Sequence, residues 1–94
     1  MEQIINGLKY DTETADLVAS DRYWDGSNYA GGGRNTYLYK TKAGRFFLHL
    51  ATCWSGERDR LEAVTVEEAR EYYEDLREYT MTYEEAFGEE PEDA

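Results

Sequence analysis

The sequence contains one cysteine, one proline and one histidine, and it has no long hydrophobic run. A single cysteine excludes an internal disulfide, which fits a reducing compartment. A membrane-spanning helix needs roughly 18 or more consecutive apolar residues, and a secretion signal needs a basic segment followed by an apolar one. Neither pattern is present, so we expect a cytoplasmic protein that makes no membrane contact.

Residue types that support catalysis or metal binding are also scarce. His49 and Cys53 could lie near the end of one strand, but no third group can be assigned to orient them. A structural zinc site takes four ligands, and these two residues are the only candidates of imidazole or thiolate type. The acids do not follow the order of an EF-hand, and the glycines at 31–33 lack the ending of a phosphate loop. The sequence therefore predicts a protein that is not an enzyme, with no cofactor and no metal.

The negative charge is confined to the C-terminal part of the chain. Residues 57–94 hold fifteen carboxylates and four arginines, which accounts for the net charge of −11, whereas residues 1–56 balance six acids against six bases. Such a field repels nucleic acid and anionic membranes and attracts basic protein surfaces. It predicts a basic protein partner and no direct binding of nucleic acid.

The first half of the chain has the pattern of short antiparallel strands. Asn6-Gly7 is typical of a two-residue hairpin turn, and a second hairpin turn is expected at 41–44. We expect a sheet of about four strands within residues 3–52, with strand segments at 4–5, 8–10, 17–19, 37–40 and 46–51.

The second half has the pattern of helices. Thr65 and Glu68 form a capping box that opens a predicted helix over 66–79, and a second box at 82–85 opens a short helical turn through Phe87. The expected fold class is α+β, with the antiparallel sheet packed against this amphipathic helix. We expect a single domain at 1–88 and a mobile acidic tail at 89–94.

The predicted helix is segregated into an apolar stripe and an acidic side. The stripe contains Val66, Ala69, Tyr73 and Leu76. Two tyrosines, Tyr72 and Tyr79, are expected along one border of the stripe. The acids expected on the opposite side are Glu67, Glu68, Glu71, Glu74, Asp75 and Glu78.

Polar outer faces are the rule for surface helices, so an ordinary solvated face is one interpretation. However, this side lacks the usual mixture of Glu and Lys. It carries like-charge pairs such as Glu71 and Asp75, each of which costs about a few tenths of a kcal/mol. A second interpretation is that the acids imitate a nucleic-acid backbone for a partner with rows of Lys and Arg, with Tyr72 and Tyr79 as anchors at the rim. A third is an acidic face that some other basic partner recognises, such as a toxin or a subunit of a larger complex.

The long segment at 20–35 offers a second candidate surface. It contains four glycines and the aromatic residues Tyr23, Trp24 and Tyr29. Long loops in small domains often carry function, and Tyr and Trp are enriched at protein interfaces. These three residues are therefore either core residues or candidate contacts of an interaction or regulatory module.

Several segments resemble a group of small, largely uncharacterised proteins from phages and bacterial mobile elements. Residues 4–15 (IINGLKYDTETA) are similar to the opening of that group, INGxxYDTETA, and 39–49 (YKTKAGRFFLH) are similar to its central YRTKKGxFFLH. Residues 66–71 (VEEARE) and 83–89 (YEEAFGE) resemble its EEAREW helix and its acidic YEExFGE ending. The chain departs from the group at 50–54 and at Tyr72, where the group has a glycine-rich stretch and a tryptophan.

The resemblance implies a mobile-element origin and a compact α+β domain, and it supplies no catalytic residues. Small acidic proteins that occupy nucleic-acid grooves are one way in which phages block restriction or CRISPR effectors. The leading hypothesis is therefore an anti-CRISPR or anti-restriction protein that acts in the cytoplasm of a bacterial host. An interaction module that uses segment 20–35 is the alternative, and an enzyme that uses His49 and Cys53 is the third.

Overall fold

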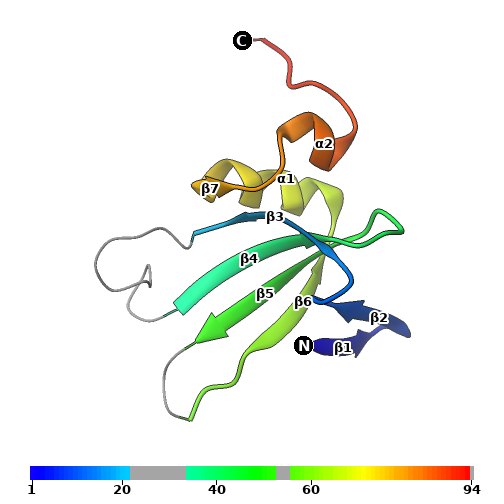
Figure 1. Cartoon of the computed structure of the whole chain (residues 1–94), viewed down its shortest axis with the longest axis vertical. Helices are drawn as coiled ribbons and strands as arrows, with labels where there is room; N and C mark the ends of the chain where they lie inside the picture. Colours follow the sequence, from blue (N-terminus) through cyan, green and yellow to red (C-terminus); the bar gives the residue numbers. More distant parts are fainter. Residues whose placement is uncertain (22–33, 53–55, 94) are drawn as a thin grey trace.

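The computed structural model describes residues 1–21, 34–52 and 56–93. In these ranges the chain forms an α+β fold of antiparallel sheets with one helix and a short helical turn (Figure 1). The elements in chain order are β1 (Glu2–Ile5), β2 (Leu8–Asp11), β3 (Asp16–Ser20), β4 (Arg34–Lys40), β5 (Phe46–Thr52), β6 (Arg60–Val64), α1 (Val66–Asp75), β7 (Glu78–Tyr79) and α2 (Tyr83–Phe87).

Five of the described strands form one sheet in the order β6-β5-β4-β3-β7, and neighbouring strands are antiparallel. The hairpin of β4 and β5 is closed at the predicted turn. The N–H of Thr41 donates to the carbonyl of Arg45 at 2.7 Å, and the N–H of Gly44 donates to the carbonyl of Thr41 at 2.9 Å. Gly44 has a φ of 87°, a conformation that glycine adopts without steric cost.

The first two strands form a separate hairpin. Asn6 and Gly7 have φ values of 53° and 77°, as the two central residues of a type I′ turn require. The predicted Asn-Gly turn is therefore confirmed.

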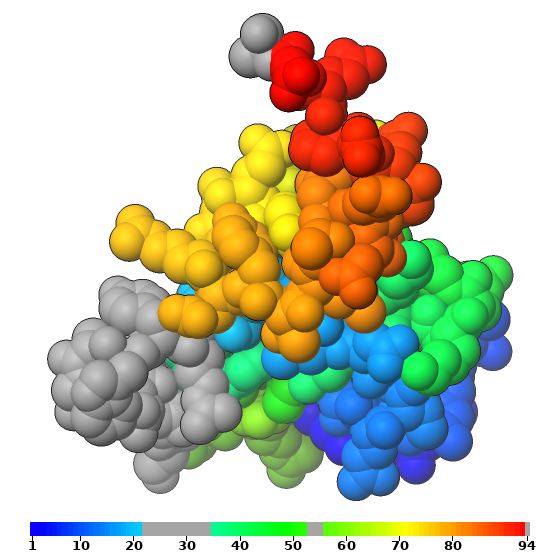
Figure 2. Space-filling model, turned by 45° about the horizontal axis from the view of Figure 1, so that its top comes forward, coloured from blue at the N-terminus to red at the C-terminus, as the bar shows by residue number. Residues whose placement is uncertain are grey.

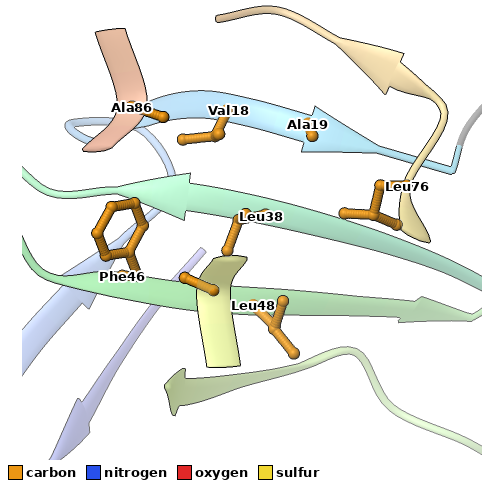
Figure 3. Close-up of a cluster of buried hydrophobic side chains, with 8 residues drawn as sticks. Val18, Ala19, Leu38, Phe46, Leu48, Leu76 and Ala86 are labelled. Carbon is orange, nitrogen blue, oxygen red and sulfur yellow. The ribbon is translucent and has the colours of Figure 1, made fainter. Parts of the chain in front are cut away.

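The interior strand β5 is buried on both of its faces, because three consecutive residues, Phe46, Phe47 and Leu48, are almost inaccessible to solvent. Side chains alternate along a strand, so Phe46 and Leu48 point to one face and Phe47 points to the other. The face of Phe46 and Leu48 is covered by the helices (Figure 3). The cluster on this face contains Val18, Ala19, Leu38, Phe46, Leu48, Ala69, Leu76 and Ala86.

The hairpin β1-β2 covers the opposite face. Tyr10 from β2 packs edge-on against Phe47, with ring centroids 5.3 Å apart, and Leu61 from β6 completes this smaller cluster. The side-chain carbonyl of Gln3 accepts a hydrogen bond from the N–H of Leu61 at 3.2 Å. The sheet therefore lies between the helices on one side and the hairpin on the other.

The sheet differs from the predicted one in size and extent. About four strands were expected within residues 3–52, but the main sheet also contains β6 and β7 from the acidic part of the chain. The strand β6 has an alternating pattern, since Leu61 is buried and Glu62 is exposed. The high charge of this segment concealed that pattern in the sequence.

The prediction that the helix extends to residue 79 is wrong, because α1 ends at Asp75. Leu76 is its C-cap, with an extended conformation (φ −78°, ψ 144°) that directs the side chain into the core, where it is 5% exposed. The chain then pairs with the free edge of β3, with Tyr79 opposite Ala19 and Glu78 opposite Ser20. Burial of Leu76 and the hydrogen bonds to β3 outweigh one further helical turn.

The start of the helix also departs from the prediction in one residue. Val66 was expected in the apolar stripe, but it is 43% exposed. It is the first residue of α1, whereas Ala69, one turn later, is fully buried against the sheet. The apolar stripe therefore begins at Ala69.

Candidate functional site

The position of α1 is set at its first turn by the predicted capping box. The Thr65 hydroxyl accepts a hydrogen bond from the N–H of Glu68 at 3.1 Å, and the N–H of Thr65 donates to the Glu68 carboxylate at 3.0 Å. The second predicted box, of Thr82 and Glu85, is confirmed in the same way at the start of α2. The carboxylates of Glu68 and Glu85 thus stabilise the first turns of α1 and α2.

Four carboxylates on α1 form what we call the acidic face: Glu67, Glu71, Glu74 and Asp75. All four residues are exposed. In the described parts of the chain, none of them makes an ion pair with a basic group. The acidic face therefore presents its charge directly to solvent.

The one basic residue of α1, Arg70, is directed away from the acidic face. Its guanidinium Nη2 lies 2.6 Å from Oε1 of Glu89, and its Cζ lies 5.6 Å from the ring centroid of Phe87 in α2. α1 and α2 lie side by side on one side of the molecule (Figure 1 and Figure 2). The guanidinium therefore ties α1 to α2 and to the segment after α2, and it does not neutralise the acidic face.

Tyr72 lies where the sequence placed it, next to acids of α1. It lines a shallow depression of about 270 Å³ together with Glu68, Glu71 and Asp75. The side chain is 36% exposed. An exposed ring surrounded by three carboxylates is a suitable contact for a cationic side chain.

Tyr79 and Glu78 do not belong to the acidic side of a helix, which corrects the prediction. Both lie on β7, and Tyr79 stacks on Tyr73 with ring centroids 4.5 Å apart. Tyr79 lines a different depression from Tyr72, and the two have no lining residue in common. The two tyrosines therefore do not form one rim.

A second group of polar residues lies at the end of β5. Nε2 of His49 lies 3.0 Å from Oδ2 of Asp59, and the N–H of Thr52 donates to Oδ1 of Asp59 at 3.1 Å. The ring of Tyr37 lies 5.5 Å from the His49 ring. Asp59 is thus an orienting group for His49 that sequence reasoning missed. Cys53, the other residue of the catalytic alternative, lies outside the described residues.

These contacts make the stability dependent on pH. The hydrogen bond from the N–H of Thr52 is the main cause that lowers the pKa of Asp59, burial opposes it, and His49 lowers the pKa further. A carboxyl whose pKa is lower in the folded chain stabilises the fold above its unfolded pKa, and this contribution is lost as the pH falls through the folded pKa.

We therefore expect Asp59→Asn to melt at a lower temperature than the wild type at pH 7. The difference should shrink as the pH falls below about 4, the usual pKa of an aspartate, and vanish once Asp59 is protonated in the folded chain. Thermal unfolding between pH 7 and pH 2 measures both midpoints. Glu13→Gln is the control for loss of an exposed carboxylate. A difference that persists unchanged at pH 2 would contradict the assignment.

The described ranges contain no group of three or more His, Cys, Asp or Glu side chains arranged to hold a metal ion. The helices in these ranges are too short and too polar to span a bilayer. The candidate loop contacts Tyr23, Trp24 and Tyr29 lie outside the described residues.

The acidic tail is described as far as residue 93, and residues 89–93 are exposed. Its first residue is held by Arg70, and Pro91 and Glu92 line the same depression as Tyr79. Mobility of the tail stays a prediction.

Comparisons with known proteins identify no relative. No significant match was found among protein-family models, curated proteins or solved structures.

Proposed function

We propose that this chain is a non-catalytic protein that binds and inhibits a bacterial nucleic-acid-targeting defence complex, of the anti-CRISPR or anti-restriction kind, in the host cytoplasm. The acidic face of α1 takes the place of nucleic acid on a basic surface of that complex. The observation that supports this proposal is that the four carboxylates of the acidic face are exposed on one helix, whose only arginine is engaged elsewhere. The likeness of several segments to small phage proteins directs the proposal to a bacterial defence complex.

The geometry of a helix suits this role. Successive turns of α1 place carboxylates about 5.4 Å apart along the axis, which is similar to the spacing of phosphates along one strand. Proteins that bind nucleic acid through its backbone present Lys and Arg to such a row, and they release counterions when it binds. The acidic face offers these side chains the same charge in a similar arrangement.

The helix also holds the carboxylates in place before binding. Ala69 and Leu76 anchor α1 to the sheet, and the capping box fixes its first turn. A preorganised surface loses less conformational entropy when it binds. This rigidity distinguishes the acidic face from a flexible acidic tail.

An ordinary solvated helix would gain stability by pairing opposite charges four residues apart. Glu71 and Asp75 instead form a like-charge pair in that spacing, and neither has a basic partner in the described ranges. The cost, about a few tenths of a kcal/mol, is understandable if a partner supplies the opposite charge.

Reversal of two charges tests the proposal. We expect Glu71→Lys with Asp75→Lys to weaken competition with nucleic acid at least about tenfold, a loss of about 1.4 kcal/mol, and to flatten its salt dependence. The target is first captured from bacterial lysate on immobilised protein at about 50 mM salt and eluted at about 0.5 M salt, where charge contacts are screened. Binding of labelled nucleic acid to the captured protein is then titrated with each variant.

The matched control is Glu13→Lys with Glu62→Lys, which changes the net charge equally, from −11 to −7, on exposed sites outside α1. Lysine at position 75, in the last turn of α1, is favoured by the helix dipole, so the test variant should keep its melting temperature. Equal competition by the two double variants would show that only overall charge matters, and undiminished competition by the test variant would overturn the proposal.

A further inference from the structure

A groove lies between α1, β7, α2 and the C-terminal segment, on the side of α1 opposite Tyr72. We call it the tyrosine groove, and it has a volume of about 480 Å³. Its lining residues are Tyr73, Glu74, Tyr79, Tyr83, Pro91 and Glu92. Figure 2 shows the elements that border it, with α1 in yellow, α2 in orange and the C-terminal segment in red.

The aromatic wall of the groove consists of rings that contact one another. Tyr73 and Tyr79 are stacked at 4.5 Å, and Tyr83 meets Tyr73 edge-on at 5.7 Å. The Tyr73 hydroxyl donates a hydrogen bond to the carbonyl of Met81 at 2.9 Å, which fixes that ring. Tyr79 is nevertheless 51% exposed. Because one face of its ring lies on Tyr73, the other face is open to solvent.

The open ring is accompanied by negative charge. Glu74 and Glu92 are exposed, and neither makes an ion pair within the described ranges. Burial is the main cause that raises the pKa of the Tyr73 hydroxyl, and the neighbouring Tyr79 and Glu85 raise it further. Arg70 does not supply a counter-charge to the groove, because Glu89 and the Phe87 ring hold it.

We propose that the tyrosine groove binds the guanidinium of an arginine side chain from the partner protein. A planar guanidinium stacks on a tyrosine face and donates hydrogen bonds to carboxylates at the same time, whereas the ammonium of lysine is compact and strongly hydrated. The contact of Arg70 with Phe87 and Glu89 is an example of this combination in the same molecule. The inference rests on the proposed function for the basic character of the partner.

Blocked pentapeptides test the inference without a partner protein. The probes are Gly-Gly-Arg-Gly-Gly and its lysine and citrulline counterparts, where citrulline has nearly the shape of arginine but no charge. Ring signals of tyrosine in 13C-labelled protein are followed by NMR at low ionic strength. We expect the arginine peptide to shift the Tyr79 and Tyr83 signals with an affinity at least about threefold higher than that of either counterpart. Equal affinities for arginine and citrulline, or for arginine and lysine, would overturn the inference.

A variant pair locates the binding site. Tyr79→Leu keeps an apolar side chain on β7 but removes the ring face, and we expect it to lower the affinity for the arginine peptide about fivefold. Tyr37→Leu removes a tyrosine ring on β4 that does not line the groove, and it should leave the affinity within about twofold of the wild type. A loss with Tyr37→Leu as large as that with Tyr79→Leu would place the arginine outside the groove. The comparison of the three peptides uses the wild-type protein, so its result does not depend on whether a variant folds.

The outcome can be separated from that of the proposed function. Glu71 and Asp75 do not line the groove, so their reversal should weaken competition with nucleic acid but preserve the threefold preference for arginine. Loss of that preference in this variant would show that the arginine binds on the acidic face and would contradict the groove assignment. If the reversed variant competes as well as the wild type while the groove still selects arginine, the proposed function fails and the groove assignment stands.

Discussion

Replacement of Phe47 by alanine is expected to lower the free energy of unfolding by about 3–5 kcal/mol. Phe47 is fully buried in the interior strand β5. Its ring meets Tyr10 edge-on at 5.3 Å and stacks on Tyr39 at 5.2 Å. Removal of the ring leaves a cavity between the sheet and the hairpin β1-β2. A domain has only about 5–15 kcal/mol of stability in total, so this one substitution removes a large fraction of it.

Urea denaturation followed by circular dichroism measures this loss. Ile4→Ala is the control, because Ile4 lies on the same hairpin but is 73% exposed, and it should change the stability by no more than about 0.5 kcal/mol. A cost below about 1.5 kcal/mol for Phe47→Ala, the range of a minor core change, would mean that the hairpin does not cover this face of the sheet.

Local signals in the sequence predicted local structure. The Asn6-Gly7 turn, the hairpin of β4 and β5 and both capping boxes occur where expected, because each depends on residues that are close in the chain. These signals fixed the order of the main elements and the α+β class.

The errors in the fold arose where distant segments meet. The end of α1 is decided by the edge of β3, more than fifty residues earlier, and the helical pattern of 76–79 contains no trace of that edge. Likewise, Phe46-Phe47-Leu48 reads as an apolar strand, but the sequence does not say that a separate hairpin covers the face of Phe47. Tertiary contacts override the local preference in the first case, and they determine which element covers the strand in the second.

The candidate site was predicted in part for the same reason. A helical wheel places Glu71, Glu74 and Asp75 outward, and all three are exposed. It cannot show that Arg70 turns to Glu89 and Phe87, nor that Tyr79 joins a groove with Tyr73. Both depend on the path of the chain after α1. The uncompensated charge of the acidic face is thus a property of the fold as well as of composition.

The introduction of a carboxylate at Ala69 is expected to have a similarly large effect. Ala69 is fully buried where α1 packs on the sheet, among Leu38, Leu48 and Leu76. Ala69→Glu would place an unpaired charge in this apolar cluster, at a cost of about 3–5 kcal/mol unless the helix detaches or the carboxyl is protonated. We expect a cooperative unfolding midpoint well below that of the wild type, measured by thermal and urea denaturation.

The same substitution tests whether the proposed binding depends on net charge alone or also on a helix that is docked on the sheet. Ala69→Glu and Val66→Glu both raise the negative charge from −11 to −12, but Val66 is exposed in the first turn of α1, where the helix dipole favours a carboxylate. If binding requires a rigid row of acids on a docked helix, Val66→Glu should keep wild-type stability and competition. Ala69→Glu should lose at least about tenfold in competition, the effect of about 1.4 kcal/mol. Equal competition by the two variants would show that negative charge alone suffices and that the docked helix is not needed.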